Sequence, residues 1–387
     1  MITDTIEIKS ASDISEISSR SKKIRVMVVD DSALMRKLLS EILSSDRDIE
    51  VVDTAMDAYA AREKIKKHDP DVITLDVEMP KMDGISFLRN LMRLRPMPVV
   101  MVSTVTEKSA AATLEALALG AIDYVTKPKI DVTSAIHDYA DELIAKVKQA
   151  AKAKQRLQAG TLKTSATPAK PAADLTHIIN RAKRSYSTTH KVIAIGASTG
   201  GTEAIREVLD QLPEDCPGVV IAQHIPVTFS RSFAERLNAT SKLTVKQAAD
   251  GDWIVPGHAY VAPGDRHLLV VRDGARYRCK LDDGPKVNRH KPSVDALFHS
   301  VATSAGRDAL GVILSGMGKD GAEGLRLMRQ HGAYTIAQDE ATSVVWGMPG
   351  EAVRLQAARA IAPVERVARQ ILVGLAEEKE QIDSQGE

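Results

Sequence analysis

The segment Val192-Ile193-Ala194-Ile195-Gly196-Ala197-Ser198-Thr199-Gly200-Gly201 decides the fold of the second half of the chain. Its apolar, β-branched start predicts a buried strand, and apolar residues at helical spacing from Ala204 to Leu212 predict a helix directly after it. Glycines permit the sharp turn between the two and the close approach of a substrate. Because a helix start offers free N–H groups and the positive end of its dipole, Ser198 is a candidate nucleophile. A phosphate-binding turn or a purely structural turn would use the same residues.

Length and charge bound the class of the protein. The 387 residues suffice for two or three domains of ~100–200 residues, and a formal net charge of +1 gives no general attraction to nucleic acid or anionic membranes. Cys216 and Cys279 lie far apart and are expected to be lone thiols. No apolar run approaches the ~20 residues of a membrane span. We therefore expect a cytoplasmic protein with no direct membrane insertion and no nucleic-acid partner.

Shifts in composition divide the chain. Residues 1–23 lack an apolar core and are expected to be a disordered extension. Residues 24–147 and 190–378 carry the two folded domains, and 379–387 is a tail. The stretch between them, 148–189, is rich in Ala, Lys, Gln, Ser, Thr and Pro, which is typical of a flexible linker.

The first domain alternates strand and helix patterns. Strands are expected at 24–29 and near 50–55, 72–75, 98–102 and 122–125, and helices near 34–43, 57–67, 84–94, 107–119 and 133–150. Five such units predict a doubly wound parallel α/β sheet with right-handed crossovers. In these sheets, functional groups gather at the carboxyl ends of the strands.

Polar side chains follow successive strands of this domain. They are Asp30, Asp31, Asp76, Ser103 and Lys127. Clustered carboxylates repel one another unless a cation neutralises them, and a hard oxygen site of this kind suits Mg²⁺. Any one of these groups could be a strand-end cap or a solvated loop residue, but the set at one sheet edge favours a site.

This domain resembles a response-regulator receiver over about 24–145. The resemblance rests on Asp30-Asp31, Asp76 before Met79-Pro80, Asp83-Gly84, Ser103 and Lys127-Pro128. It implies that Asp76 accepts a phosphoryl group from a chemotaxis histidine kinase. It also implies that Asp30, Asp31, Asp76 and the Glu78 carbonyl hold Mg²⁺, and that Ser103 and Lys127 contact the phosphoryl oxygens.

The second domain is expected to hold a mostly parallel α/β sheet with an antiparallel insertion. Strands are expected near 192–195, 218–222, 309–314 and 333–337, and helices near 204–212, 228–239, 293–304, 322–331 and 364–376. Shorter runs near 243–247, 258–262, 267–272 and 276–281, separated by Gly and Pro, predict the insertion.

Three apolar strands of this domain lead to Ser198, His224 and Asp320. If the strands are parallel, their carboxyl ends meet at one edge, and a serine, a histidine and an aspartate form the set that a nucleophilic hydrolase needs. Each residue also has an ordinary explanation. Ser198 and Asp320 could each cap a helix, and His224 could be a histidine of the protein interior.

Other residues compete for these roles. His258, His267 and His290 are rival bases, and Asp282 and Asp283 are rival orienting carboxylates. They rank lower because they lie on the expected insertion or on loops. The order Ser, His, Asp differs from the order Ser, Asp, His of α/β-hydrolases, although Gly196-x-Ser198-x-Gly200 has the spelling of their nucleophile turn.

The second domain resembles the catalytic domain of the CheB family of protein-glutamate methylesterases over about 190–375. The matching segments are Gly196 to Gly201, Gln223 to Pro226, Phe233 to Leu237, Pro292 to Asp295 and Gly316 to Gly321. The resemblance implies Ser198 as nucleophile, His224 as general base and Asp320 as orienting residue, with the Met317 N–H at the oxyanion.

The combined resemblance implies a function. A phosphorylation-regulated hydrolase would demethylate glutamate methyl esters and deamidate glutamines on methyl-accepting chemoreceptors, giving adaptation in chemotaxis, without a cofactor for the esterase. In the family, the receiver packs over the active-site edge until Asp76 is phosphorylated. Two other outputs remain possible from the residues: a DNA-binding domain, for which no basic helix stands out, and a non-catalytic scaffold.

Overall fold

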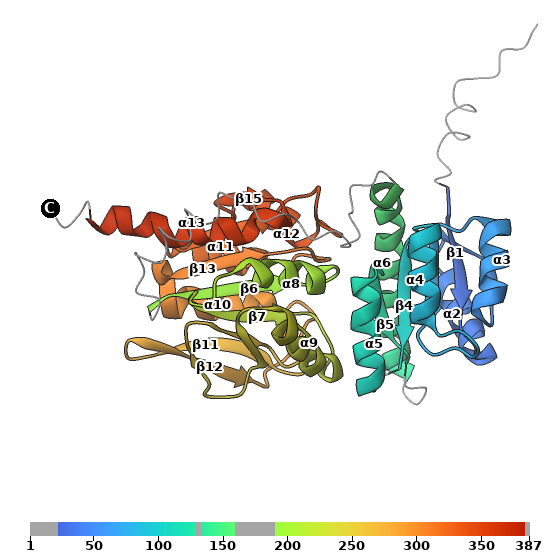
Figure 1. The fold of residues 1–387 in the computed structure, drawn as a ribbon, viewed down its shortest axis with the longest axis horizontal. Helices are drawn as coiled ribbons and strands as arrows, with labels where there is room; N and C mark the ends of the chain where they lie inside the picture. The colour runs from blue at the N-terminus through green and yellow to red at the C-terminus, as the bar shows by residue number, and fades with distance from the viewer. Residues whose placement is uncertain (1–21, 105, 129–132, 159–189, 384–387) are drawn as a thin grey trace, which may run out of the picture.

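The computed structural model describes residues 22–104, 106–128, 133–158 and 190–383 (Figure 1). Residues 1–21 of the expected extension at 1–23, most of the expected linker, and the last four residues lie outside this range. Within it, the chain forms two α/β domains, and no helix is long and apolar enough to cross a membrane.

The first domain is the predicted doubly wound sheet. Its parallel strands lie in the order β2-β1-β3-β4-β5. The strands are β1 (Ile24–Val29), β2 (Ile49–Ala55), β3 (Val72–Asp76), β4 (Val99–Ser103) and β5 (Asp123–Thr126). The helices are α2 (Ala33–Ser44), α3 (Ala58–His68), α4 (Gly84–Leu94), α5 (Glu107–Ala118) and α6 (Thr133–Gln158). Successive residues of β1 face opposite cores, since Val26 and Val28 pack on one side and Met27 and Val29 on the other.

Helix α6 is longer than predicted and corrects the boundary at 147. It continues to Gln158, and Val147, Ala150 and Ala153 are all buried against the first domain. Alanine, lysine and glutamine are strong helix formers. A segment whose composition suggested a flexible linker therefore forms a helix, because its alanines pack against the first domain. The predicted linker therefore begins no earlier than 159.

The second domain contains a seven-stranded parallel sheet in the order β15-β14-β13-β6-β7-β10-β8. Its strands are β6 (Val192–Ala197), β7 (Gly218–Gln223), β8 (Thr244–Gln247), β10 (His258–Val261), β13 (Ala309–Ile313), β14 (Tyr334–Gln338) and β15 (Ala360–Ala362). Helices α8 (Gly201–Gln211), α9 (Val227–Thr240), α10 (Val294–Ala305), α11 (Ala322–Gln330), α12 (Met348–Arg354) and α13 (Val364–Asp383) cover it. Strand β6 lies between β7 and β13, where the order of the strands reverses, and such a point is the usual ligand site of an open α/β sheet.

The antiparallel part is smaller than predicted. It consists of β9 (Trp253–Ile254), β11 (His267–Asp273) and β12 (Arg276–Asp282), in the order β11-β12-β9. The runs near 243–247 and 258–262 instead form β8 and β10 of the parallel sheet, because Val245, Ala259 and Val261 are buried in the core beside α9. Two further differences are α13, which extends into the predicted tail as far as Asp383, and the unpredicted α12 and β15.

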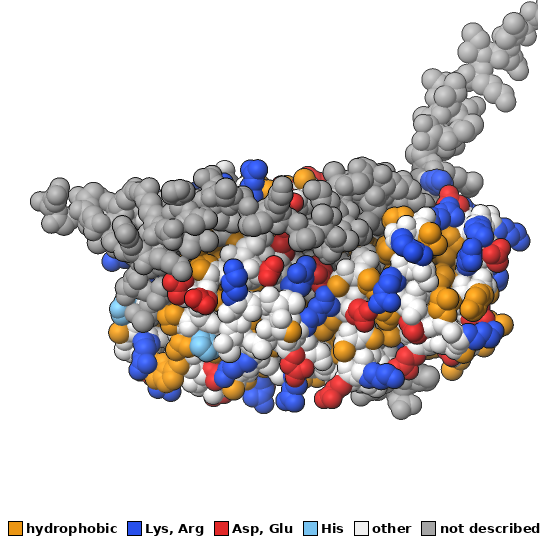
Figure 2. Space-filling view, viewed as in Figure 1, with side chains coloured by type: hydrophobic (Ala, Val, Ile, Leu, Met, Phe, Trp, Pro, Cys, Tyr) orange, Lys and Arg blue, Asp and Glu red, His pale blue; other side chains and the backbone are white. Residues whose placement is uncertain are grey.

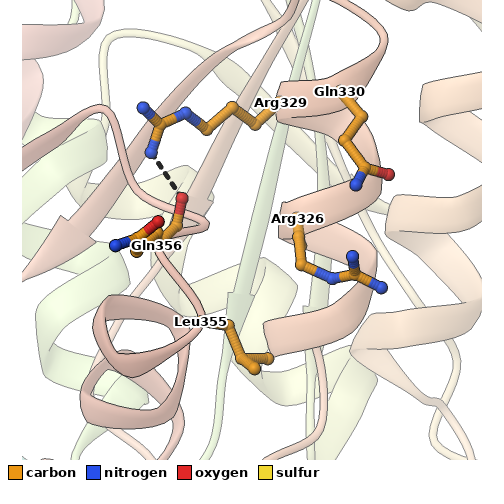
Figure 3. Close-up of a pocket in the computed structure, with 5 residues that line it drawn as sticks. All are labelled: Arg326, Arg329, Gln330, Leu355 and Gln356. Carbon is orange, nitrogen blue, oxygen red and sulfur yellow. Dashed lines mark hydrogen bonds between the residues drawn. The ribbon is translucent and has the colours of Figure 1, made fainter.

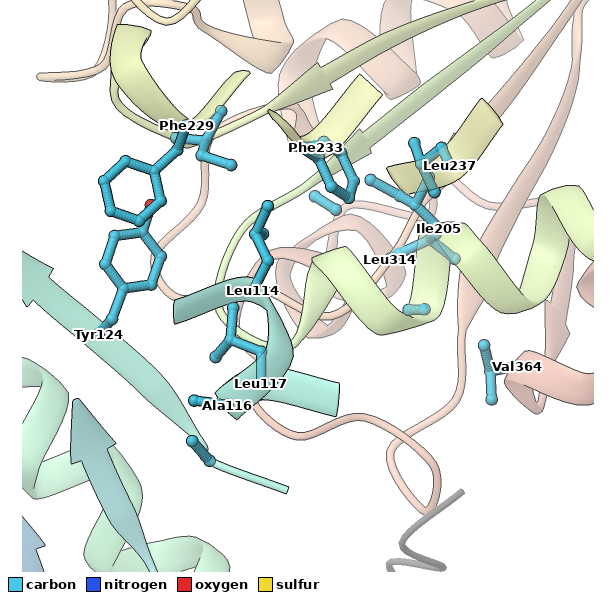
Figure 4. Close-up of a cluster of buried hydrophobic side chains, with 14 of the residues drawn as sticks. Leu114, Ala116, Leu117, Tyr124, Ile205, Phe229, Phe233, Leu237, Leu314 and Val364 are labelled. Atoms are coloured by element: carbon cyan, nitrogen blue, oxygen red, sulfur yellow. The ribbon is translucent and has the colours of Figure 1, made fainter. Parts of the chain in front are cut away.

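An apolar contact joins the two domains. The ring of Tyr124 in β5 stacks on the ring of Phe229 in α9, with centroids 4.9 Å apart and planes 8° from parallel. Leu114 of α5 belongs to the same buried cluster as Phe233 and Leu237 of α9 (Figure 4). One hydrophobic core therefore continues from the first domain into the second.

Polar contacts surround this apolar junction. The Thr199 hydroxyl donates a hydrogen bond to Asp123, whose other carboxylate oxygen lies 3.4 Å from Lys146 Nζ. The guanidinium of Arg236 donates to the Leu114 carbonyl and also pairs with Glu203 at 2.9 Å. The first domain thus holds the residue that directly follows Ser198.

The end of α6 gives a test of the revised boundary. Ala153→Glu should lower the free energy of unfolding of the first domain by about 3 kcal/mol, because it buries a charge without a partner. Urea unfolding followed by circular dichroism measures the effect. Lys152→Glu is the matched control on the exposed side of the same turn. Equal, small effects of the two substitutions would contradict the packing of this segment.

Candidate active site

Ser198 lies directly after β6, on the turn that leads into α8. Its N–H donates to the Ser315 carbonyl at 3.0 Å, which ties the turn to the segment after β13. Gly200 has a φ of 76°, and a side chain there would collide with Val344, so the position requires glycine. The predicted strand–turn–helix around Ser198 is therefore confirmed.

His224 follows β7 and lies beside Ser198. Strands β6 and β7 pair in register as far as Ala197 and Gln223, and the His224 N–H donates to the Ala197 carbonyl at 3.1 Å. The Gln223 side chain adds a bond from Nε2 to the Ser198 carbonyl at 2.9 Å. Because adjacent strands lie about 5 Å apart, the next pair after this register is Ser198 and His224.

Asp320 is a buried carboxylate with many donors. His224 Nε2 lies 2.8 Å from Oδ2, and the Val294 N–H donates to the same oxygen at 2.7 Å. Asn288 Nδ2 and the Ser293 hydroxyl donate to Oδ1 at 2.7 and 2.9 Å. Burial works against the charge, but the hydrogen bonds from His224, Asn288 and Val294 outweigh it and hold the pKa of Asp320 well below its usual range.

The three predicted residues are therefore brought to one edge, but not all of them are bonded. Among the described residues, His224 Nδ1 is buried without a hydrogen-bond partner, and no bond joins it to the Ser198 hydroxyl. The pair His224–Asp320 is formed, while the contact between the serine and the histidine is left open. Hydrogen bonds of this kind often tighten only when substrate is bound.

Of the rival bases, only His290 lies at this edge. Its ring stacks on that of His224, with centroids 3.7 Å apart. Burial and the neighbouring His224 lower the pKa of His290 to about 4. His267 instead binds the Pro285 carbonyl and the Ser293 N–H, and His258 binds the Pro256 carbonyl.

The rival carboxylates point elsewhere. Asp282 accepts from the Gly284 N–H at 3.1 Å, and Asp283 pairs with Arg266 on the surface. Sequence reasoning missed Asn288 and Ser293, which hold the second oxygen of Asp320. Ser293 carried a signal, since a serine before an apolar helical run is a typical N-cap, and it caps α10 here. Asn288 carried none.

The segment after β13 covers the serine from the other side. A side chain at Gly316 would lie 2.9 Å from Ser198 Cβ and 2.2 Å from Met348 Sδ, so no larger residue fits. Gly316 also forms a bridge with Trp346, whose indole N–H donates to the Gln338 carbonyl at 3.1 Å. Met317 follows Gly316 and is half-buried. Among the described residues, no acceptor pairs with its N–H.

The carboxylates predicted for the first domain also meet. Ligand atoms of Asp30, Asp31 and Asp76 lie within 4.8 Å of one another. Lys127 Nζ lies 2.9 Å from Asp30 and 2.8 Å from Asp76. Burial, opposed by the hydrogen bond from Lys127 and reinforced by the charge of Asp30, raises the pKa of Asp76 to about 6. Two buried carboxylates and an exposed one within this distance form a suitable donor set for a divalent cation.

Ser103 and Glu78 face away from this cluster. The Ser103 hydroxyl accepts from Thr113 at 2.9 Å and donates to the Thr104 carbonyl. The Glu78 side chain accepts from the Ser109 hydroxyl at 3.1 Å, which leaves its backbone carbonyl as the group predicted to serve the cation. The structure therefore gathers the carboxylates and Lys127, and does not bring the Ser103 hydroxyl to Asp76.

One hollow on the described surface lies apart from both groups of predicted residues. A hollow between α11 and the end of α12 contains none of the predicted site residues (Figure 3). It is lined by Arg326, Arg329, Gln330, Leu355 and Gln356. In the view of Figure 2, Lys and Arg side chains are interspersed with Asp and Glu over the described residues.

Comparison with known proteins decides the family. A model of the response regulator receiver domain matches residues 26–137, and a model of CheB methylesterase matches 193–371. A Xanthomonas euvesicatoria protein named protein-glutamate methylesterase/protein-glutamine glutaminase 1 is 57% identical over 351 residues, covering 90% of this chain and 96% of that protein. The chain belongs to the CheB family. A Hydrogenovibrio crunogenus protein-glutamate methylesterase/protein-glutamine glutaminase is 52% identical, covering 90% and 98%.

Structural similarity was also found. The crystal structure of the Thermotoga maritima CheB methylesterase catalytic domain is 36% identical, covers 48% of this chain and 98% of that chain, and has a TM-score of 0.47. By the two family models and the relatives, the two domains are a response-regulator receiver and a CheB methylesterase domain, and the chain is an esterase and glutaminase of this family. A DNA-binding or non-catalytic output is not favoured.

The stack of histidines predicts a pH effect on stability. Folded His290 stays neutral to about pH 4, whereas the unfolded chain takes up this proton below about pH 6.5, so stability is lost as the pH falls through that window. His290→Phe keeps a ring and removes the titration. Between pH 7 and 4.5, the wild type should lose about 2 kcal/mol more than this variant in urea unfolding.

His299→Phe is the matched control, because His299 is exposed on α10. This control should follow the wild type. If His290→Phe kept the full acid sensitivity, the neutral stacked state of His290 would be wrong.

Proposed function

We propose that Ser198 is the nucleophile, His224 the general base and Asp320 the orienting carboxylate of protein-glutamate methyl ester hydrolysis. The observation that carries the proposal is the state of His224. Its Nε2 is bonded to buried, ionised Asp320, so this nitrogen carries the proton and Nδ1 is the free acceptor. That acceptor belongs to the residue beside Ser198.

The chemistry proceeds in two halves. The Ser198 oxygen attacks the γ-carbonyl of the glutamyl methyl ester while His224 takes the hydroxyl proton, and the oxyanion is held by the Met317 N–H. Collapse of the intermediate expels methanol, which leaves with the proton from His224. Water then attacks the acyl-enzyme by the same route and releases a glutamate. With glutamine as substrate, ammonia leaves in place of methanol.

The substrates and partners follow from the family. We infer that methyl-accepting chemoreceptors supply the glutamyl esters, that a chemotaxis histidine kinase supplies the phosphoryl group, and that the enzyme works in the cytoplasm. Family membership over nearly the whole chain supports these assignments. The esterase needs no cofactor in this scheme, since all of its groups come from the chain.

Phosphorylation belongs to the receiver. Asp76 is the proposed phosphoacceptor, and Asp30, Asp31 and Asp76 with the Glu78 carbonyl would hold Mg²⁺, which neutralises and aligns phosphoryl oxygens. The hydrogen bond from Lys127 to Asp76 supports a role for this lysine in binding the new oxygens. Ser103 would have to turn from Thr113 to join it.

We infer that the contact between the two domains regulates access of the substrate to Ser198. The Thr199 hydroxyl bonds to Asp123 of the receiver, one residue from the nucleophile. The contacts of α5 and β5 with α8 and α9 would keep a large substrate helix from Ser198. Phosphorylation of Asp76 would loosen the contact and admit the substrate.

The triad is tested by removing its members. Ser198→Ala should abolish methanol release from methylated receptor membranes, and Asp320→Asn should lower it by about 10³- to 10⁴-fold, since the imidazole loses its orientation and charge partner. Methanol is measured with a coupled alcohol assay. Asp339→Asn removes a carboxylate that lies outside the triad and is the control. Full activity of Ser198→Ala would refute the assignment.

The control by the receiver is tested at the stacked rings. Tyr124→Ala removes the partner of Phe229 and should raise methanol release by the unphosphorylated protein by about fivefold, because an aromatic pair contributes about 1 kcal/mol. A small phosphodonor should then add less than it adds to the wild type.

Tyr59→Ala changes an exposed receiver tyrosine and should leave the rate unchanged. The domain contact would have no inhibitory role if Tyr124→Ala and Tyr59→Ala gave equal rates with and without the phosphodonor.

A further inference from the structure

A tight turn lies at the edge of the triad. The Val287 and His290 backbones bond to each other in both directions, at 2.9 and 3.1 Å, and enclose Asn288 and Arg289. Both enclosed residues have positive φ, 51° and 71°. A two-residue turn of this kind favours Asn followed by Gly, because glycine adopts positive φ without steric cost.

The structure explains the positive φ of one central residue of the turn but not that of the other. Asparagine tolerates positive φ, and the Asn288 side chain bonds to Asp320 and Asp295, at 2.7 and 2.6 Å. Arg289 occupies the glycine position, is exposed, and has no carboxylate partner among the described residues. Since no described residue pairs with its side chain, the strained arginine points to a use outside the fold.

The turn places Arg289 between two residues that contact Asp320 and His224. Arg289 directly follows the residue that bonds Asp320 and directly precedes the residue that stacks on His224. Lys286, three residues earlier on the same loop, is also exposed and is likewise unpaired among the described residues. Lys291 is different, because it binds the carbonyls of Asp283 and Gly284.

We propose that Arg289, with Lys286, binds a carboxylate of the substrate protein that flanks the glutamyl ester. The inference rests on the proposed function, because it assumes that the ester is presented at Ser198. A segment that carries glutamates around its reactive residue is anionic, and two exposed cations on the loop that contacts Asp320 and His224 would select and orient it. Arg289 acts in substrate binding and takes no part in the proton transfers.

Two peptides test the proposal in the full-length protein with a small phosphodonor present. Each carries one glutamate γ-methyl ester on a helical sequence, flanked at the third and fourth positions either by glutamates or by glutamines. The ratio of kcat/KM for the acidic peptide to that for the neutral peptide is measured in wild type, Arg289→Gly and Arg289→Lys. Glycine fits the turn, so Arg289→Gly removes the charge without straining the fold.

Arg289→Gly should lower this ratio about three- to fivefold through KM, and Arg289→Lys should restore most of it. High salt should compress the wild-type ratio. Lys242→Gln, which removes an exposed cation beyond the far end of α9, should leave the ratio unchanged. Peptide binding is also measured in a Ser198→Ala background, so that recognition is observed without turnover and its failure is separable from failure of the triad.

Two outcomes would overturn the inference. An equal loss on both peptides in Arg289→Gly would show that the turn serves only the geometry of His224 and Asp320. An equal gain on both peptides without the phosphodonor would show that Arg289 holds the receiver in place.

Discussion

The second domain depends on satisfying the charge of Asp320. A buried carboxylate without donors would cost several kcal/mol. Its donors come from His224 after β7, and from the loop before α10 with the first turn of that helix, a segment that lies far from His224 in the chain. Because all of these segments must converge on one pair of oxygens, the requirement also brings His224 to the edge where Ser198 lies. The same hydrogen bonds therefore stabilise the buried carboxylate and bring the residues of the site together.

The sequence predicted the site where geometry follows from the regular sheet. Ser198 and His224 follow neighbouring parallel strands, so the ends of the two strands were enough to predict that these residues lie side by side. Asp320 lies seven residues after β13, and it was predicted as the carboxylate to which a third apolar strand leads. Asn288 could not be found this way, since its role depends on an irregular turn with positive φ. Hydrophobic periodicity carries no information about such a turn.

The departures in the fold have a related cause. Val147, Ala150 and Ala153 form a weak apolar stripe that becomes helix only because the receiver offers a surface to it. Strands β8 and β10 have the short apolar runs of a hairpin, but β10 pairs with the distant strand β7, β8 pairs with β10, and α9 contacts both. The contact of Tyr124 with Phe229 likewise leaves no pattern in either segment. Each of these features is decided by a partner that is distant in the chain.

The placement of the two tryptophans has a spectroscopic consequence. Both Trp253 and Trp346 belong to the hydrolase domain, so the receiver contributes no indole emission. Trp253 lies against the guanidinium groups of Arg276 and Arg278, while Trp346 bridges the glycine that precedes Met317. Indole fluorescence of the intact chain, excited where tyrosine does not absorb, therefore observes one domain alone, and part of that signal originates beside the glycine that precedes Met317. The protein carries its own optical probe of the catalytic edge.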